Sequence, residues 1–255
     1  MPTITTFYKR EVAEESMPEK RIVKLSPNPT GFGEVADELE KSMFESSLPK
    51  QCSHSYYEDD ALGLYIGVWD TTDMIETAAP YTCDEFMTII EGAVEIKNCQ
   101  TGTMETVTAG ESFVIPQGYD CQWHQQGYLR KFYVIYEPPT EKITANPVCD
   151  HIIYINEKSD LPWQETSDGF NKKIQYQSHN QKFTSGVWQG NRFKTGIIAF
   201  PYNEFISLQH GSLLCIDEQG NELEINAGEA LFVPQGTRCS WESQEEISIH
   251  FVQIK

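Results

Sequence analysis

The strongest constraint on the fold is an internal repeat, in which a series of short motifs occurs twice in the same order. The two copies of the early motifs lie 119 residues apart (186 − 67), and the two copies of the late motifs lie 118 apart (228 − 110). The paired motifs are Gly67-Val68-Trp69 with Gly186-Val187-Trp188, Glu85-Phe86 with Glu204-Phe205, Ala109-Gly110-Glu111 with Ala227-Gly228-Glu229, and Pro116-Gln117-Gly118 with Pro234-Gln235-Gly236. Because a turn tolerates the loss of one residue and a strand register does not, the pattern predicts two copies of one structural unit.

Each copy has the sequence pattern of short β-strands. Residues 93–96 alternate between apolar and polar, and the apolar run at 112–115 ends at a Pro-Gln-Gly turn. Short strands bounded by Gly, Pro, Asn and Asp are typical of an antiparallel barrel or jelly roll. The expected fold class is therefore all-β, with two barrels in tandem. Residues 33–44 alone show helical spacing, with apolar residues at 35, 39 and 43, and predict a short amphipathic helix.

Paired prolines mark the expected domain boundary. Pro138 and Pro139 cannot continue a β-ladder, so we expect an N-terminal domain with a leading arm at 1–139 and a C-terminal domain at 140–255. Residues 21–25 and 151–155 stand at comparable places before the two repeats. We expect each to form an edge strand of the barrel that follows it.

Charge and composition exclude several classes of partner. A net charge of −19 repels phosphate backbones and anionic lipid surfaces, which argues against nucleic-acid and membrane partners. The chain has no apolar run long enough for a membrane helix, and the charged residues of its first twenty positions do not match a signal peptide. Seven cysteines without a C-x-x-C pair indicate free thiols, so we expect a cytoplasmic protein.

The repeated glycine, proline and glutamate positions resemble the two cupin motifs, G-x5-H-x-H-x3,4-E-x6-G and G-x5-P-x-G-x2-H-x3-N. Glu85 with Gly92 and Glu204 with Gly211 fit the end of the first motif, and 110–118 and 228–236 fit the start of the second. Trp123 and Trp241 further resemble a cupin subgroup that contains ethanolamine-utilization proteins and ureidoglycine aminohydrolase-like domains. The resemblance implies that each copy is a double-stranded β-helix and the chain a bicupin.

The histidines that hold a metal in cupins are missing from both copies. In the first copy the motif positions carry Ala78 and Pro80, or Ala79 and Tyr81, and then Cys121. In the second copy they carry Ile197 and Ala199, or Ile198 and Phe200, and then Cys239. Since a divalent ion needs three or four converging donors, we expect no metal cofactor. A zinc ion at Glu85 and Cys121 is the alternative.

The first copy keeps the polar residues that a pocket requires. Glu85 and Tyr81 are the candidate catalytic residues, the carboxyl group as acid or base and the phenol as hydrogen-bond donor. The candidate substrate-binding residues are Trp123, Trp69, Cys121 and Cys83. The tryptophans and cysteines also fit ordinary core packing, and Glu85 also fits an internally paired strand residue.

These features predict a degenerate metal site in a protein that binds a small molecule in its N-terminal barrel. For an enzyme, the resemblance to cupins implies non-redox chemistry on a small polar nitrogen-containing or carbonyl metabolite. The alternative is a non-catalytic metabolite sensor or an assembly protein that uses its strand edges for subunit contact. In either case we expect a homodimer.

Overall fold

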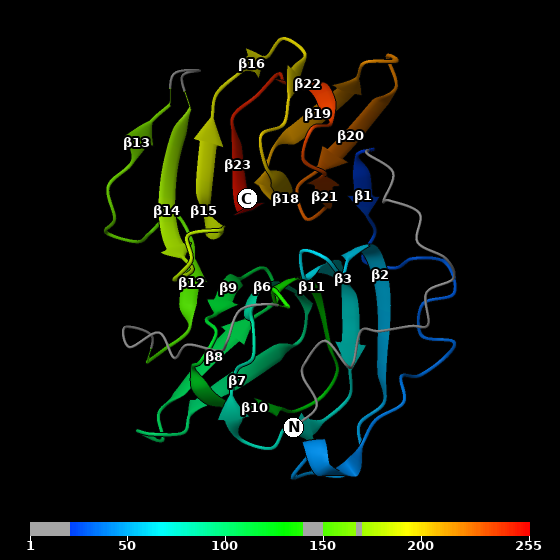
Figure 1. The fold of residues 1–255 in the computed structure, drawn as a ribbon, viewed down its shortest axis with the longest axis vertical. Coiled ribbons are helices and arrows are strands. Elements are labelled where there is room, and N and C mark those ends of the chain that lie inside the picture. The colour runs from blue at the N-terminus through cyan, green and yellow to red at the C-terminus, as the bar shows by residue number, and fades with distance from the viewer. Residues whose placement is uncertain (1–20, 140–149, 167–169) are drawn as a thin grey trace. The chain divides into compact units, whose positions relative to one another are not determined.

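The β-strands of the chain form two separate units (Figure 1). The structure, a computed structural model, describes residues 21–139, 150–166 and 170–255. Among these residues, the first unit, which we name barrel 1, spans Pro27–Tyr154. The second unit, barrel 2, spans Ile155–Lys255 and includes residues 21–26. No helix in the described ranges has the length and apolarity that a bilayer crossing requires.

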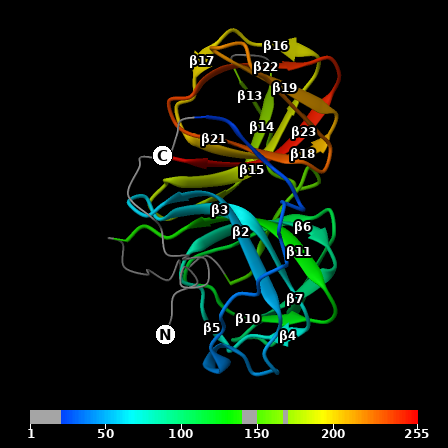
Figure 2. The ribbon, with the colours of Figure 1, turned by 90° about the vertical axis from the view of Figure 1, so that its right-hand side faces the viewer.

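Barrel 1 consists of two antiparallel sheets (Figure 2), and its buried core is made of apolar side chains. The larger sheet has the order β12-β9-β6-β11-β3-β2, and the smaller has the order β4-β10-β7-β8, with β5 also paired to β10. The strands are β2 (Gln51–Asp59), β3 (Leu64–Thr71), β4 (Met74–Ile75), β5 (Ala79–Pro80), β6 (Asp84–Glu91), β7 (Ala93–Asn98), β8 (Met104–Thr108), β9 (Ser112–Ile115), β10 (Asp120–Gln125), β11 (Leu129–Tyr136) and β12 (Ile153–Ile155).

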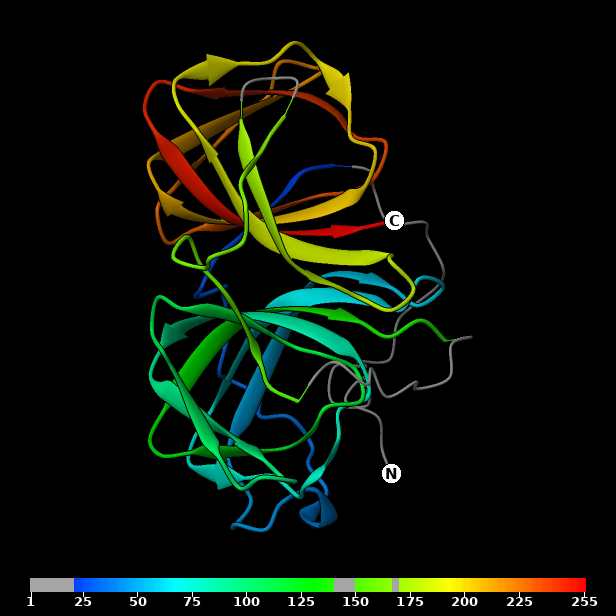
Figure 3. The ribbon, with the colours of Figure 1, turned by 90° about the vertical axis from the view of Figure 1, so that its left-hand side faces the viewer.

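Barrel 2 repeats this architecture (Figure 3). Its sheets have the orders β1-β21-β18-β23-β15-β14-β13 and β16-β22-β19-β20, with β17 also paired to β22. The strands are β1 (Val23–Leu25), β13 (Gln164–Glu165), β14 (Asn171–Gln177), β15 (Phe183–Gly190), β16 (Phe193–Lys194), β17 (Ile198–Ala199), β18 (Asn203–His210), β19 (Ser212–Asp217), β20 (Glu222–Asn226), β21 (Ala230–Val233), β22 (Arg238–Ser243) and β23 (Ile247–Ile254). The matching strand orders confirm the expected all-β fold with two barrels.

The repeated Gly-Val-Trp motif has the same structural cause in both barrels. Gly67 on β3 faces an irregularity in the pairing with β2, and Gly186 on β15 faces one in the pairing with β14. A β-carbon at Gly67 would overlap the carbonyl oxygen of His54, and one at Gly186 would overlap that of Lys173. Only glycine lets the neighbouring strand approach this closely. The tryptophan two residues later then lies on the inner face of the strand.

The two edge strands differ from the sequence expectation. Residues 23–25 form an edge strand that pairs with β21 of barrel 2, and β12 lies next to β9 in the sheet of barrel 1. Each segment therefore extends the sheet of the other barrel. The apolar pattern of residues 21–25 predicts a strand with a buried face, and Leu25 is fully buried. The pattern does not indicate which sheet edge the strand joins.

The predicted helix at 33–44 is wrong. Only Lys41–Met43 are helical, as a single 3-10 turn named η2, and Val35 is exposed. The N–H of Asp37 donates instead to the carbonyl of Gln51 at 2.8 Å, and the N–H of Glu45 donates to Ile75 at 2.9 Å. Pairing with the barrel thus replaces the local hydrogen bonds of a helix. The expected boundary at 139/140 adjoins residues 140–149, which lie outside the described ranges, and stays a prediction.

Candidate functional site

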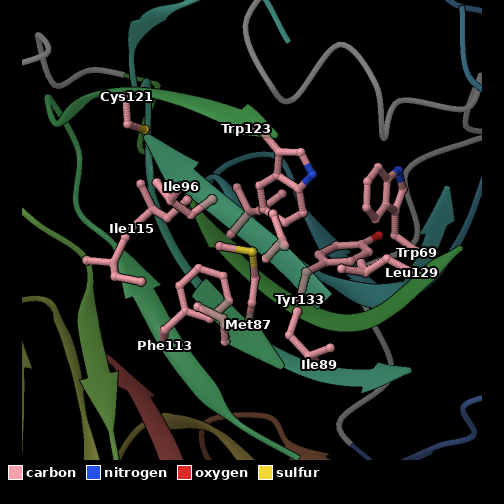
Figure 4. Packing of buried hydrophobic residues seen from close by; sticks show 14 of the residues in the cluster. Trp69, Met87, Ile89, Ile96, Phe113, Ile115, Cys121, Trp123, Leu129 and Tyr133 are labelled. Carbon is pink, nitrogen blue, oxygen red and sulfur yellow. The ribbon is translucent and has the colours of Figure 1, made fainter. Parts of the chain in front are cut away.

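Barrel 1 contains a cavity of about 350 Å³ that brings five of the six predicted site residues together. Trp69, Tyr81, Glu85, Cys121 and Trp123 all line it. Figure 4 shows Trp69, Trp123 and Cys121 projecting into the interior of barrel 1. The remaining lining residues are Ser42, Met43, Gln51, Glu76, Thr77, Ala79, Pro80, Thr82, Ile96, Ile115 and Lys131. The sixth predicted residue, Cys83, is fully buried in the surrounding apolar core and does not line the cavity.

A buried ion pair lies at the cavity. The Lys131 ammonium contacts Glu85 Oε1 at 2.8 Å, and the two side chains are only 4 % and 1 % exposed. The Tyr81 hydroxyl donates to the other carboxylate oxygen, Oε2. Both oxygens of Glu85 are therefore occupied. Burial and the Glu85 charge raise the pKa of Tyr81 well above its usual value, which keeps the phenol protonated as a donor.

The ammonium of Lys131 is also enclosed by aromatic rings. Its Nζ lies 4.8 Å from the ring centroid of Trp69 and 4.8 Å from that of Trp123, and the two indoles meet edge to face at 88°. It also lies 3.0 Å from the sulfur of Met87. Indole faces attract a desolvated cation. Together with Glu85, these contacts surround the ammonium.

Strand register explains why these side chains meet. On β11 the inward residues are Leu129, Lys131, Tyr133 and Ile135, so the lysine takes one position in an otherwise apolar series. Lys131 is directly opposite Trp69 on β3. The turn at 116–118 positions Tyr81, because Gly118 N–H donates to the Tyr81 carbonyl at 2.7 Å and Tyr81 N–H donates to Tyr119 at 2.9 Å.

Glu76 provides a second carboxyl group at the cavity. Its backbone N–H donates to the Trp123 carbonyl at 3.0 Å, and Gln122 Nε2 donates to its carbonyl at 2.8 Å. Its carboxyl group accepts no hydrogen bond from the described residues. The pKa of Glu76 is raised to about 7, chiefly by burial; the Lys131 charge lowers it and the Glu85 charge raises it. A carboxyl group in this state can accept or donate a proton near neutral pH.

The two cysteines predicted for the site are protonated thiols. Burial is the largest cause that raises the pKa of Cys121 and of Cys83 well above the usual value, and neighbouring carboxylates raise both further. Because the thiolate is the nucleophile and the metal ligand, neither side chain is activated for these roles.

The donor set at Glu85 does not fit the metal that the resemblance implies. An ammonium and a phenol already occupy both carboxylate oxygens, and a divalent ion bound there would meet the positive charge of Lys131. In the described ranges, no group of three or more His, Cys, Asp or Glu side chains is arranged to hold a metal. Glu85 and Cys121 therefore do not form a zinc site with the partners that they have here.

Barrel 2 carries apolar or neutral residues at three of the four corresponding positions. Ile249 replaces Lys131, Phe200 replaces Tyr81, and Thr195 replaces Glu76. Phe200 stacks on Trp241 at 5.0 Å and fills the space beside it. Glu204 keeps the place of Glu85 but accepts a hydrogen bond from Gln253 at 3.1 Å. The polar arrangement around Lys131 is therefore particular to barrel 1.

Lys131 and Glu76 were not among the predicted site residues, although the repeat contains a signal for both. Aligned at offsets of 118 and 119, Lys131 corresponds to Ile249 and Glu76 to Thr195. Lys131 also interrupts an apolar series of period two at 129, 131, 133 and 135. A charged residue on the inner face of one copy, with an uncharged residue at the same place in the other, is the pattern that indicates a site in a duplicated barrel.

Comparison with known proteins gives one family. The family model described as the EutQ-like cupin domain matches residues 63–133 and 177–251, which together are more than half of the chain. None of the curated protein sequences compared with the chain matches it.

Solved structures share the fold at low sequence identity. A protein of unknown function from Pseudomonas syringae pv. tomato has a TM-score of 0.71 and 17% identity over 92% of this chain and 100% of its own. A candidate dioxygenase from Nostoc punctiforme has a TM-score of 0.63 and 15% identity over 96% of this chain and 85% of its own. A cupin 2 conserved barrel domain protein from Leptotrichia buccalis has a TM-score of 0.58 and 11% identity over 84% of this chain and 100% of its own. At these identities the likeness shows the fold alone.

Proposed function

The chain belongs to the family of EutQ-like cupin domains, and from that premise we propose that barrel 1 binds a small polar metabolite without a transition metal. The observation that carries the proposal is the difference between the two barrels. Barrel 1 keeps a buried Lys131–Glu85 pair beside a cavity of about 350 Å³, whereas barrel 2 has Ile249 in place of the lysine.

Energetics support a functional role for this pair. A buried ion pair contributes little net stability, and well-packed apolar residues in its place are often equally stable or more so. Barrel 2 shows that the fold accepts an apolar residue at the lysine position. A charged pair retained at a cavity is therefore better explained by ligand binding than by folding.

The cavity also suits a small ligand in size and lining. About 350 Å³ holds a molecule of on the order of ten nonhydrogen atoms, since a water molecule takes up about 30 Å³ in the liquid. Trp123, Ile96 and Ile115 offer apolar walls, and Tyr81, Glu85 and Glu76 offer polar groups. This mixture is typical of small-molecule sites.

If barrel 1 is an active site, we propose that Glu76 transfers the proton. The Lys131 ammonium and the Tyr81 phenol engage both carboxylate oxygens of Glu85. The carboxyl group of Glu76 faces the cavity without a hydrogen-bond partner among the described residues, and its pKa of about 7 suits an acid or a base at neutral pH. Glu85 and Tyr81 then act as positioning residues.

A metabolite screen with matched variants tests the proposal. We expect at least one small polar metabolite to raise the melting temperature of the wild type and of Tyr128→Phe, which alters a tyrosine outside the cavity. The same metabolite should protect Tyr81→Phe less, because that change removes a hydroxyl at the site. A full screen without a protecting metabolite would favour the alternative of an assembly protein. Equal protection of all three proteins would contradict binding in this cavity.

We also propose a cytoplasmic homodimer. The strand β8 ends the smaller sheet of barrel 1 and exposes Met104, which supports pairing between subunits at a strand edge. The six cysteines at described positions carry free thiols, which suits a reducing compartment. Sedimentation velocity at several concentrations tests the dimer, and a single species at the monomer mass of 29.1 kDa would contradict it.

A further inference from the structure

We infer that the ligand of barrel 1 is a small organic cation and that the Glu76 carboxylate binds its ammonium group. This inference rests on the proposed function and names its ligand class. Three features of the cavity support it: the position of Glu76, the balance of charges that face it, and the apolar walls beside it.

Glu76 is held firmly at the cavity by its backbone. It lies between β4 and β5, where its main chain exchanges hydrogen bonds with Trp123 and Gln122 of β10 at 3.0 and 2.8 Å. On the other side it forms an isolated bridge with Phe44. These contacts leave the carboxyl group as the part of Glu76 that can meet a ligand.

The other charged and titratable groups around Glu76 are already paired or neutral. They are Lys131 from β11, Glu85 from β6, Tyr81 beside β5, and Cys121 from β10. The Lys131 charge is balanced by Glu85, which also accepts the Tyr81 hydrogen bond. Burial keeps the Cys121 thiol protonated. When Glu76 is ionised, the cavity thus carries one negative charge that no described side chain balances.

An ammonium ligand supplies the missing charge. With a cation bound, two carboxylates face two ammonium groups and the buried site is neutral overall. A carboxylate ligand would instead leave two unbalanced negative charges in a desolvated space, which is strongly unfavourable. A neutral amide could donate to Glu76 but would not compensate its charge. The charge balance therefore favours a cation over both alternatives.

The walls next to Glu76 suit a short apolar chain on that cation. Ile96, Ile115 and Trp123 line the same cavity. Burial of a ligand methylene group against them strengthens binding by about fourfold for each group. The ligand class is thus a primary or secondary amine with a short apolar or weakly polar body.

Three probes of one carbon skeleton test the inference: n-butylammonium, butyramide and butyrate, each titrated calorimetrically into the full-length protein. At about pH 8, where Glu76 is ionised, we expect n-butylammonium to bind most tightly and butyrate least. Glu76→Gln keeps the shape and removes the charge, and should weaken n-butylammonium by about 30-fold or more. Glu95→Gln, the same change at an exposed position of β7, should leave binding unchanged.

The pH dependence gives an independent readout. Because Glu76 must lose its proton to bind a cation, n-butylammonium affinity should fall on acidification through pH of about 7 in the wild type and stay flat in Glu76→Gln. Butyramide or butyrate binding as tightly as n-butylammonium, no binding of any probe, or n-butylammonium binding that Glu76→Gln leaves unchanged would each overturn the inference. The proposed function fails separately, when the metabolite screen yields no ligand for barrel 1.

Discussion

Replacing Lys131 with methionine should destabilise barrel 1, because it leaves the Glu85 carboxylate buried without a cation. The ammonium contacts Glu85 at 2.8 Å, and the carboxylate is 1 % exposed, so water cannot replace the lost partner. Removing one member of a buried pair costs about 3–5 kcal/mol. The loss of the contacts with two indole faces adds about 1–2 kcal/mol, which methionine partly restores by its own packing. We therefore expect the free energy of unfolding of barrel 1 to fall by about 3–5 kcal/mol at neutral pH.

The double variant Lys131→Met with Glu85→Gln should recover most of this loss. It removes both charges and keeps two side chains of similar size, and barrel 2 already carries Ile249 at the lysine position. We expect its free energy of unfolding to lie within about 1–2 kcal/mol of the wild-type value. The interaction energy of the double-mutant cycle should then be at least about 2 kcal/mol.

Hydrogen exchange in urea can measure this effect in one barrel at a time. A global unfolding curve would mix two units, so the readout should be peptides from β6 and β11, which report on barrel 1 alone. Lys172→Met in barrel 2 serves as the control. Lys172 donates to Gln253 at 2.7 Å and reaches Glu204 only through that amide, so its removal should cost barrel 2 less. A loss below about 1 kcal/mol for Lys131→Met, or no recovery in the double variant, would refute the buried pair.

Three further predictions follow from buried polar groups. The pKa of Glu76 is raised to about 7 in the folded chain, so the free energy of unfolding of barrel 1 should fall by about 1–3 kcal/mol as the pH rises from about 4.5 to 7. Urea titrations of Glu76→Gln should show no such pH dependence. Burial lowers the pKa of His250 to about 4, so the free energy of unfolding of barrel 2 should fall by up to about 3 kcal/mol as the pH falls from about 6.5 to 4. A His250→Gln variant with the same pH dependence of stability would contradict this. Tyr81→Phe should cost barrel 1 about 1.5–3 kcal/mol in the same exchange assay, because Glu85 loses a buried hydrogen bond.

The fold could be predicted from the sequence because the repeated residues are those that the backbone requires. Gly67 and Gly186 permit the close approach of a neighbouring strand, and this need is local to each copy. The partner of an edge strand is not local. Residues 21–25 show a strand pattern, yet the sheet that they join is set by packing against β21, far along the chain. The same limit explains the helix wrongly expected at 33–44, whose backbone groups pair with the barrel instead.

The candidate site could be predicted only in part. Tyr81, Glu85 and Trp123 were predicted because they lie in or beside the repeated cupin motifs, and all three line the cavity. Lys131 lies outside those motifs. Its role depends on the Nζ reaching past Met87 to a carboxylate on another strand, a relation that only three-dimensional packing reveals. A comparison of the two copies position by position would have singled it out.

A crystal structure of the protein grown with added zinc and manganese, with anomalous data collected at both edges, tests the central claim most directly. The account predicts the Lys131 ammonium between Trp69 and Trp123, in contact with Glu85, and no anomalous peak in the cavity of barrel 1. A metal ion coordinated by Glu85, with Lys131 displaced from the carboxylate, would contradict it.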